Sequence, residues 1–235
     1  DRASWVAGVQ NGIVKDDLLA EAFGADRVVG AVTILGAQRE ANGNVVVTSR
    51  GATYLGELGG GGSSRVEGAA RVLHGAGIPT EVATDIQSVL WSKACNAVGV
   101  FGVCVLTRSS GPRMSSNPSL IRAYHDLIRE TAAVADAYGV VIGDYEGFPI
   151  RTYLDKSAAD MMRLAEERAA ARESGPRGPE NLPSMLQDLL AGRPMEADQI
   201  FGDVVRRAEQ VGVKVPRIAL VRDLVIGLDR AVGSP

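Results

Sequence analysis

Short apolar runs of two kinds alternate over residues 1–84. Runs rich in Val, Ile and Thr predict strands, whereas runs with apolar residues three and four positions apart predict helices, here ending before a glycine. Strands are predicted at residues 4–9, 27–35, 44–49 and 79–84, helices at residues 16–23 and 64–77, and a hairpin turn at Asn42-Gly43. This alternation is typical of an α/β domain.

The pattern changes near residue 84, because no strand is predicted after that point. Asp85, Asn117-Pro118 and Pro194 are residue types that commonly begin helices. Six helices are predicted, at residues 85–106, 118–139, 159–173, 184–192, 194–212 and 217–232. We therefore expect an α/β domain over residues 1–84 and an all-helical domain over residues 85–235.

The stretch Val89–Leu106 is apolar enough to resemble a membrane span. It contains Lys93 near its start and Asn96 beside it, and a charged residue within a span is costly in a bilayer. A buried helix of a globular core is therefore the prediction, and no membrane partner is expected.

Composition narrows the function classes. The 235 residues carry a formal net charge of −3, and a weakly acidic surface argues against nucleic acid as a partner. Cys95 and Cys104 are too few for a disulfide framework, so we expect a reducing, cytoplasmic location. His74 and His125 have no His or Cys neighbours at metal-ligand spacing, and no metal site is predicted.

Lys93 is the most unusual residue of the first long helix. That helix has an apolar stripe formed by Ile86, Val89, Leu90, Ala97, Val100 and Phe101. Lys93 lies four residues from both Val89 and Ala97, so it falls on the stripe. Burial there disfavours the charged form and lowers the pKa of the ammonium, which suits a general acid. The alternative is a lysine whose ammonium reaches solvent past an apolar stem.

Three further polar residues are candidates, each with a simpler interpretation. Asn96 lies one turn from Lys93, although an asparagine on a helix often only forms local hydrogen bonds. Glu196 falls in the first turn of the helix predicted from Pro194, four residues before Ile200, so it should point toward the half-buried face, although a carboxylate in a first turn is common. Asn11 follows a predicted strand, the position at which α/β sheets bind ligands, although Asn-Gly is also an ordinary turn.

Gly99 and Gly102 each cost helix stability, on the order of 1 kcal/mol. Their presence predicts that another backbone or a ligand packs closely against this helix. One hypothesis is therefore a non-catalytic module whose helical half forms dimers.

Several segments together resemble the ketopantoate reductase family. They are QNGI at Gln10–Ile13, GAVTILGA at residues 30–37, GEL at Gly56–Leu58, WSK at Trp91–Lys93, PSMLQDLLAGRPMEAD at Pro183–Asp198, and VGVKVPR at residues 211–217. Their order and spacing are specific, and the segment from Ser184 to Glu196 is the most diagnostic. The resemblance extends over nearly the whole chain.

The resemblance implies an NADPH-dependent oxidoreductase that reduces 2-dehydropantoate (ketopantoate) to pantoate, a step of pantothenate and coenzyme A biosynthesis. It implies that residues 1–84 are part of a Rossmann-type NADP-binding domain, and that residues 85–235 form a helical domain like that of 6-phosphogluconate dehydrogenase. The resemblance also implies the roles of single residues. The expected catalytic residues are Lys93 and Glu196, and the expected substrate contacts are Asn96, Ser184 and Asn11. Asn11 and Glu196 also contact the cofactor, and a homodimer through the helical domain is expected.

Two local differences from the family pattern concern the substrate. The family has an asparagine four residues after the lysine, where this chain has Ala97, and Asn96 is three residues after. A shift of one residue turns a side chain by about 100° on a helix. Pro183-Ser184 stands where the family has two serines. A relative acting on a different 2-keto acid is therefore the alternative.

The glycine-rich cofactor fingerprint of the family has no counterpart in the chain, since no GxGxxG is present. That segment supplies the pyrophosphate site at a helix N-terminus. The resemblance therefore leads us to expect an N-terminally truncated form that binds NADPH poorly by itself.

Overall fold

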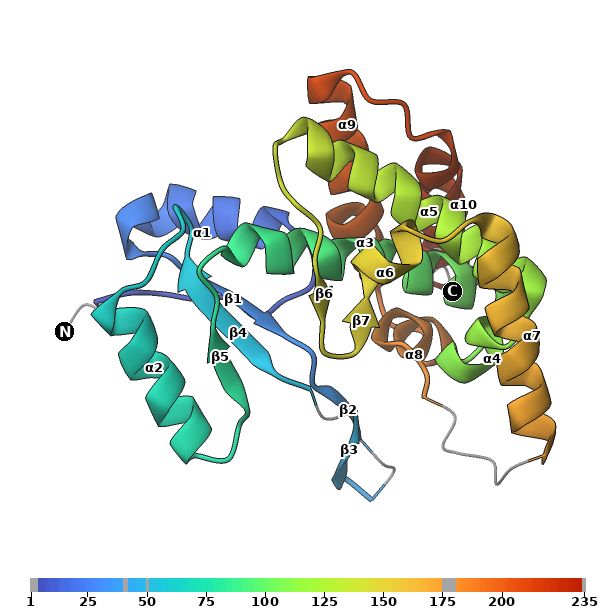
Figure 1. Ribbon diagram of the computed structural model, residues 1–235, viewed down its shortest axis with the longest axis horizontal. Helices are drawn as coiled ribbons and strands as arrows, with labels where there is room; N and C mark the ends of the chain where they lie inside the picture. Colours follow the sequence, from blue (N-terminus) through green and yellow to red (C-terminus); the bar gives the residue numbers. More distant parts are fainter. Residues whose placement is uncertain (1–3, 40–41, 50, 175–180, 234–235) are drawn as a thin grey trace.

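The computed structural model describes residues 4–39, 42–49, 51–174 and 181–233. An α/β part and a helical part lie side by side, and the long helix α3 (Ile86–Thr107) extends from one into the other (Figure 1). The α/β part consists of α1 (Val14–Phe23), the 3-10 turn η1 (Ala25–Arg27), β1 (Val29–Thr33), β2 (Gly36–Arg39), β3 (Val45–Ser49), β4 (Thr53–Glu57), α2 (Ser64–Gly75) and β5 (Thr80–Val82).

The main sheet has the order β1-β4-β5 and is covered on both faces. Strand β4 pairs antiparallel with β1 and parallel with β5. Because side chains alternate along a strand, Val29, Ala31 and Leu55 pack with α2, in a cluster with Val66 and Ala70. The alternate positions Val32 and Tyr54 belong to the large core that also contains α3. The sheet therefore lies between α2 and the start of α3.

A pair of glycines brings α3 onto the sheet. Gly30 and Gly56 are directly opposite each other in the β1–β4 register. A Cβ on Gly30 would lie 2.8 Å from Cγ1 of Ile86, and a Cβ on Gly56 would lie 2.8 Å from its Cβ. Any larger residue would push the first turn of α3 away. The contact fixes the place of Lys93, which follows two turns later on the same helix.

The helical part contains all six predicted helices. Its elements are α4 (Gly111–Ser115), α5 (Pro118–Ala137), β6 (Asp144–Tyr145), β7 (Phe148–Pro149), α6 (Ile150–Leu154), α7 (Ala158–Ser174), α8 (Ser184–Leu190), the π-helical turn η2 (Asp198–Gly202), α9 (Asp203–Val211) and α10 (Pro216–Gly233). The predicted caps are present: Asp85 accepts the N–H of Ser88 at 3.1 Å, and Asn117 accepts that of Ser119 at 3.0 Å.

The apolar helix α3 is the core of the helical part. In the described part of the chain it is the one helix long and apolar enough to span a membrane, but 78% of its apolar window is buried inside the protein. It packs against α5 along its length and also contacts α8 and α10. The prediction of a buried core helix is therefore confirmed.

The predicted strand at residues 4–9 needs correction, and four strands, β2, β4, β6 and β7, were not predicted. Residues 4–9 form no strand, only an isolated parallel bridge between Val6 and Val28, because the chain turns away from β1 after one pair. Strand β4 was missed because its five residues, which lie between glycine-rich segments, show no clear alternation of apolar and polar positions. The short hairpin β6–β7 was also missed, because two-residue strands are formed by tertiary contacts rather than by propensity.

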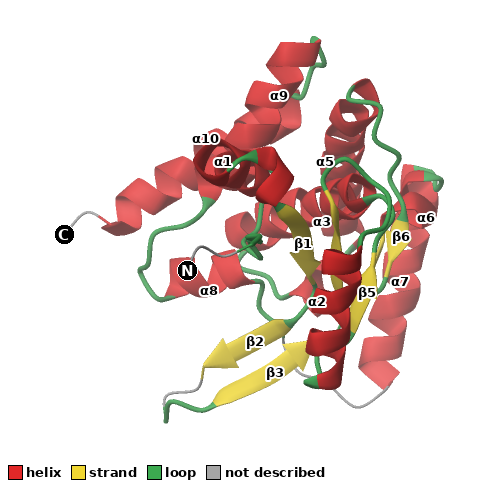
Figure 2. Ribbon diagram, turned by 90° about the vertical axis from the view of Figure 1, so that its left-hand side faces the viewer, coloured by secondary structure: helices red, strands yellow, loops and turns green. Residues whose placement is uncertain are grey.

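The predicted hairpin turn at Asn42-Gly43 is present, but it joins β2 to β3 rather than β1 to β3. The N–H of Asn44 donates to Oδ1 of Asn42 at 2.9 Å, and Gly43 has a φ of 89°, which favours glycine. The hairpin projects from the body of the protein (Figure 2).

One core joins the two parts, since Val32 and Tyr54 from the sheet belong to the same buried cluster as α3 and α5. The boundary expected near residue 84 falls just before α3 and stays a prediction.

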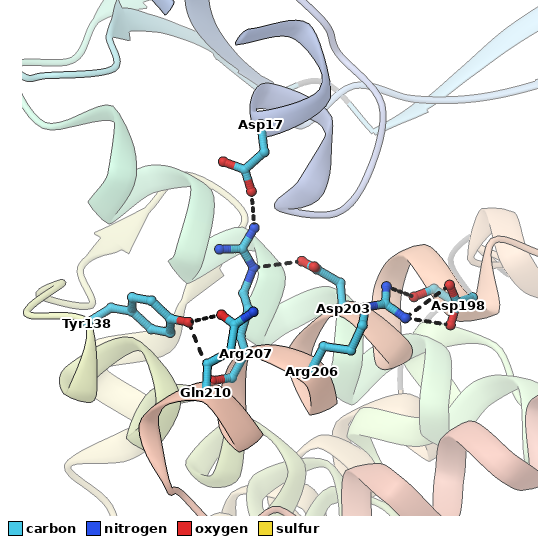
Figure 3. A network of polar contacts seen from close by, with 7 residues as sticks. All are labelled: Asp17, Tyr138, Asp198, Asp203, Arg206, Arg207 and Gln210. Atoms are coloured by element: carbon cyan, nitrogen blue, oxygen red, sulfur yellow. Dashed lines mark hydrogen bonds and ion pairs between the residues drawn. The ribbon is translucent and has the colours of Figure 1, made fainter. Parts of the chain in front are cut away.

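Arg207 of α9 connects α1 to the helical part (Figure 3). Its guanidinium donates to the carboxylate of Asp17 on α1 and, at 2.9 Å, to that of Asp203 on its own helix. The same guanidinium lies 6.0 Å from the centre of the Trp91 ring on α3. Tyr138, after α5, donates to Gln210 at 2.7 Å. The Arg207 contacts thus connect α1 with α9 and α3.

Candidate active site

A cavity of about 600 Å³ lies between the α/β part and the helical part. Its wall is formed by the loop before α1, the β1–β2 connection, the helices α3, α4, α5, α6 and α7, and the start of α8. Four residues singled out from the sequence line it together: Asn11, Lys93, Asn96 and Ser184. The tertiary structure thus brings side chains from three distant segments to one cavity.

Lys93 is partly buried on α3, and its ammonium holds its proton weakly. Desolvation is the main cause that lowers the pKa of Lys93 to about 8, and the positive charge of Lys15 lowers it further. The negative charge of Glu196 acts in the opposite direction. The desolvation expected from the apolar stripe is confirmed. A lysine with this pKa can donate a proton near neutral pH.

Lys15, which sequence reasoning missed, is a second lysine beside Lys93. Both residues line a cavity of only about 10 Å³, next to Asn11. Lys15 is buried in the first turn of α1, where its Nζ lies 2.6 Å from Oδ1 of Asp16. No sequence pattern indicates that Lys15 is buried. It stands next to Asp16 and Asp17, and acidic residues in a first turn are also common on exposed helices.

Asp16 completes a buried ion pair that is only partly satisfied. Burial raises the pKa of its carboxyl, and the positive charge and hydrogen bond of Lys15 oppose that shift. Its second oxygen, Oδ2, is buried without a hydrogen-bond partner in the described part of the chain. The pair therefore places a fixed ammonium close to Lys93.

Asn96 faces the large cavity, and Ala97 faces the small one beside Lys15. The one-residue shift thus turns the amide toward a different wall, as the helix geometry predicted. Oδ1 of Asn96 accepts a hydrogen bond of 3.0 Å from the Tyr124 hydroxyl on α5. Tyr124 is therefore a further residue of the site, and it holds the Asn96 amide in place.

Gly99 makes room for Tyr124. A Cβ at Gly99 would lie 2.5 Å from Cδ2 of the Tyr124 ring, and a Cβ at Gly102 would lie 3.0 Å from Cγ1 of Val221. The close packing predicted at both glycines is present, but side chains of α5 and α10 in the same chain provide it. The glycines therefore give no indication of a second chain.

Asn11 lies where two cavities meet. It lines the large cavity and also a second one of about 350 Å³, which includes Gln10, Lys15, Leu18 and Glu196. The next residue, Gly12, has a φ of 91°, and a Cβ there would lie 2.8 Å from the carbonyl oxygen of Gln199. The loop is thus pressed against η2, and only glycine fits at its closest point.

The position predicted for Glu196 is wrong in two respects. The helix begins after Glu196, so this residue precedes its first turn, and its side chain is exposed rather than half-buried. The chain just before the helix is held by α10 instead, since the N–H of Met195 donates to Oδ1 of Asp229 at 2.9 Å, and the carbonyl of Glu196 accepts the first helical hydrogen bond, from the N–H of Ile200 at 3.1 Å. Glu196 lines the second cavity and not the large one, although it is close enough to raise the pKa of Lys93.

Arg168 and Tyr153 also line the large cavity, and sequence reasoning missed both. An arginine in the charge-rich segment of α7 looks like an ordinary solvent-exposed residue, so no sequence signal identifies it. Among the described residues, no group of three or more His, Cys, Asp or Glu side chains comes together as a metal site would require.

The chain is similar to solved structures over nearly its whole length. The 2-dehydropantoate 2-reductase of Methylococcus capsulatus is 24% identical with a TM-score of 0.77, and the match covers all of this chain and 74% of that one. A D-mandelate dehydrogenase in complex with NADH is 20% identical with the same TM-score, over 99% of this chain and 72% of that one. Both likenesses show the fold.

Sequence comparison identifies the family. The 2-dehydropantoate 2-reductase of Archaeoglobus fulgidus is 29% identical over 97% of this chain, which spans 69% of that protein's length. The family model "Ketopantoate reductase PanE/ApbA" matches residues 1–60, and "Ketopantoate reductase PanE/ApbA C terminal" matches residues 85–229, more than half of the chain. The chain therefore belongs to the ketopantoate reductase family.

Proposed function

We propose that the protein reduces the ketone of 2-dehydropantoate to the hydroxyl of pantoate, with NADPH as the hydride donor. The observation that carries this proposal is Lys93, an ammonium with a pKa of about 8 on the wall of a cavity that amide and hydroxyl side chains also line. The family and the name of the Archaeoglobus fulgidus relative support the substrate.

A bound reduced nicotinamide supplies the hydride. When that group is bound, the carbonyl carbon of the substrate would accept this hydride and the C=O π electrons would move to oxygen. Lys93 donates a proton from Nζ to that oxygen, which becomes the hydroxyl, and the neutral amine regains a proton from solvent. Before that step, the positive charge of Lys93 stabilises the negative charge that develops on oxygen.

The other site residues take supporting roles in the proposal. Asn11 contacts both the substrate and the nicotinamide end of the cofactor, because it lines both larger cavities. Asn96 and Ser184 bind the substrate from the wall of the large cavity. Glu196 orients the lysine and binds the cofactor from the second cavity, where its charge favours the protonated form of Lys93.

The residues of the second cavity fit one end of a nicotinamide cofactor. Leu18, Leu19 and Val14 give it an apolar wall, while the Asn11 amide and the Glu196 carboxylate can bind polar groups of a carboxamide or a ribose. The sequence contains no GxGxxG, so these residues account for the nicotinamide end only. The preference for NADPH over NADH is therefore inferred from the family alone.

A different 2-keto acid is the second candidate substrate. The shift of Asn96 onto the wall of the large cavity, with Ala97 on the small one, favours this second substrate.

We further infer a cytoplasmic location from the two free, buried cysteines. We also infer a homodimer through the helical part, where Leu220 and Leu224 of α10 are exposed. Sedimentation of the purified protein tests the dimer.

The test is a direct assay of the protein produced from its whole gene. NADPH consumption is followed with 2-dehydropantoate, pyruvate and benzoylformate, and each reaction is repeated with NADH. We expect 2-dehydropantoate with NADPH to give the highest kcat/KM. A higher kcat/KM with another keto acid would identify that acid as the substrate in place of 2-dehydropantoate. No consumption of NADPH or NADH with any of the three acids would support a non-catalytic helical module instead.

A further inference from the structure

Arg168 on α7 is a second positive charge on the wall of the large cavity. It is half-buried, and no carboxylate of the described residues lies within ion-pair distance of its guanidinium. Arg163, five positions earlier on the same helix, is exposed and paired with Asp160. Arg168 thus differs from its neighbour in facing the cavity with its charge uncompensated.

The Arg168 guanidinium is held in place on the cavity wall. Its Nη2 donates a hydrogen bond of 3.0 Å to the Tyr153 hydroxyl, and its Cζ lies 5.9 Å from the centre of that ring. Only one of the five N–H groups of a guanidinium is used in this bond. The remaining donors are available to a ligand in the cavity.

A series of contacts connects Arg168 to the turn of α3 that carries Lys93. The Tyr153 ring packs edge-on against Tyr124, with the ring centres 6.2 Å apart. The Tyr124 hydroxyl in turn donates to Asn96, one turn from Lys93. Lys93 and Arg168 therefore lie on one continuous wall of the cavity. The side chains of Tyr153, Tyr124 and Asn96 lie between the two helices that carry them.

We propose that Arg168 binds the carboxylate of the substrate and thereby restricts the enzyme to 2-keto acids, in preference to esters and neutral ketones. This inference rests on the proposed reductase function. Lys93 is assigned to the ketone oxygen, and Arg168 is the other cation among the described residues that line the same cavity. A guanidinium matches a carboxylate with two parallel N–H···O bonds, and an uncompensated charge in a cavity attracts an anion more strongly than one already paired.

A structural role for Arg168 is the competing explanation, because its bond to Tyr153 also joins α7 to α6. The two explanations differ in their dependence on substrate charge. Loss of a structural contact impairs turnover of every substrate alike. Loss of a carboxylate anchor impairs the acid and leaves a neutral analogue of the same shape unaffected.

The test compares 2-dehydropantoate with its methyl ester in the protein produced from its whole gene. For Arg168→Met we expect kcat/KM for the acid to fall about 10- to 100-fold, the range of a lost charge-assisted hydrogen bond. The value for the ester should stay unchanged, so the acid-to-ester preference collapses. Arg163→Met is the matched control on the same helix, and it should leave both values unchanged.

Two more variants separate the charge from its geometry. Arg168→Lys keeps the charge without the planar fork, so it should recover only part of the preference. Tyr153→Phe keeps the ring and removes the hydroxyl that holds Arg168, so it should raise KM for the acid with little change in kcat. Circular dichroism confirms that each variant is folded.

The inference on Arg168 is overturned if Arg168→Met lowers kcat/KM equally for acid and ester, or changes neither. That result differs from failure of the proposed function, in which the unmodified protein reduces no 2-keto acid with NADPH. A wild-type enzyme that shows no preference for the acid over its ester also contradicts the inference.

Discussion

Lys15 of α1 and Lys93 of α3 line the same cavity of about 10 Å³, so two ammonium groups from distant segments are neighbours. Lys15 has a carboxylate partner, since Nζ lies 2.6 Å from Oδ1 of Asp16. Among the described residues Lys93 has no carboxylate within ion-pair distance. The repulsion therefore acts mainly on the proton of Lys93, and it lowers the pKa of that group in addition to desolvation.

The pH dependence of reduction should report this pair. In the proposed reaction the protonated form of Lys93 is the proton donor, so kcat should fall as the pH rises through about 8. Removing the charge in Lys15→Met raises the pKa of Lys93, and the fall should move to higher pH. Lys214→Met, at an exposed position, is the control and should leave the profile unchanged. A profile that does not move in Lys15→Met contradicts the assigned role of Lys15.

Glu196→Gln should move the same profile in the opposite direction. The Glu196 carboxylate favours the charged form of Lys93, so its removal lowers the pKa of the lysine further. The fall in kcat should then occur below pH 8. Because Glu196 is exposed, the shift should shrink as salt is added. The same direction of shift in both variants would contradict the electrostatic account.

Lys93→Met should lower kcat by about 10²- to 10⁴-fold, the usual contribution of a positioned proton donor. The substitution keeps the length of the side chain and removes a desolvated charge, so the unfolding temperature should not fall. Kinetics and thermal unfolding on the same preparation check both statements. Wild-type turnover in this variant would remove Lys93 from the mechanism.

Gly99→Ala should both destabilise the protein and disturb the site. The new Cβ would lie 2.5 Å from the Tyr124 ring, and overpacking of this kind costs about 1–3 kcal/mol. Displacement of Tyr124 also releases the Asn96 amide, so KM for the keto acid should rise. The control is Gly68→Ala on α2, where a Cβ meets only a distant arginine tip at 4.0 Å, and where alanine should stabilise the helix by up to about 1 kcal/mol.

Arg207→Met should weaken the connection between α1 and the helical part. The substitution leaves the buried Asp203 without its partner, a change that costs about 3–5 kcal/mol for a buried pair. Asp17→Asn removes only the exposed partner and should cost no more than about 1 kcal/mol. Urea unfolding measures both values. Equal losses in the two variants would show that the contact to α1, rather than Asp203, determines the stability.

The features that the sequence predicted well are local ones. Asp85 and Asn117 cap helices through atoms two or three residues away, so the signal and its effect lie in one short segment. Lys93 could be placed on a buried face because the 3.6-residue period of α3 is itself a sequence property. The motifs that resemble the family likewise identified Asn11, Asn96 and Ser184, which the fold brings to one cavity.

Other features depend on contacts between segments that are distant in the sequence. Lys15 lines one small cavity together with residues of α3, and the Arg168 guanidinium is held by a tyrosine from another helix. Glu196 lies outside the first helical turn, and the residue before it, Met195, donates its N–H to Asp229 of α10, a contact 34 positions away along the chain that no short-range pattern indicates. The sequence by itself therefore determined most of the helices, and it placed Lys93, the residue proposed as proton donor, on the apolar face of α3, through local periodicity and capping. Only the tertiary structure decided which charges surround that donor, because their energies depend on distance and burial in space.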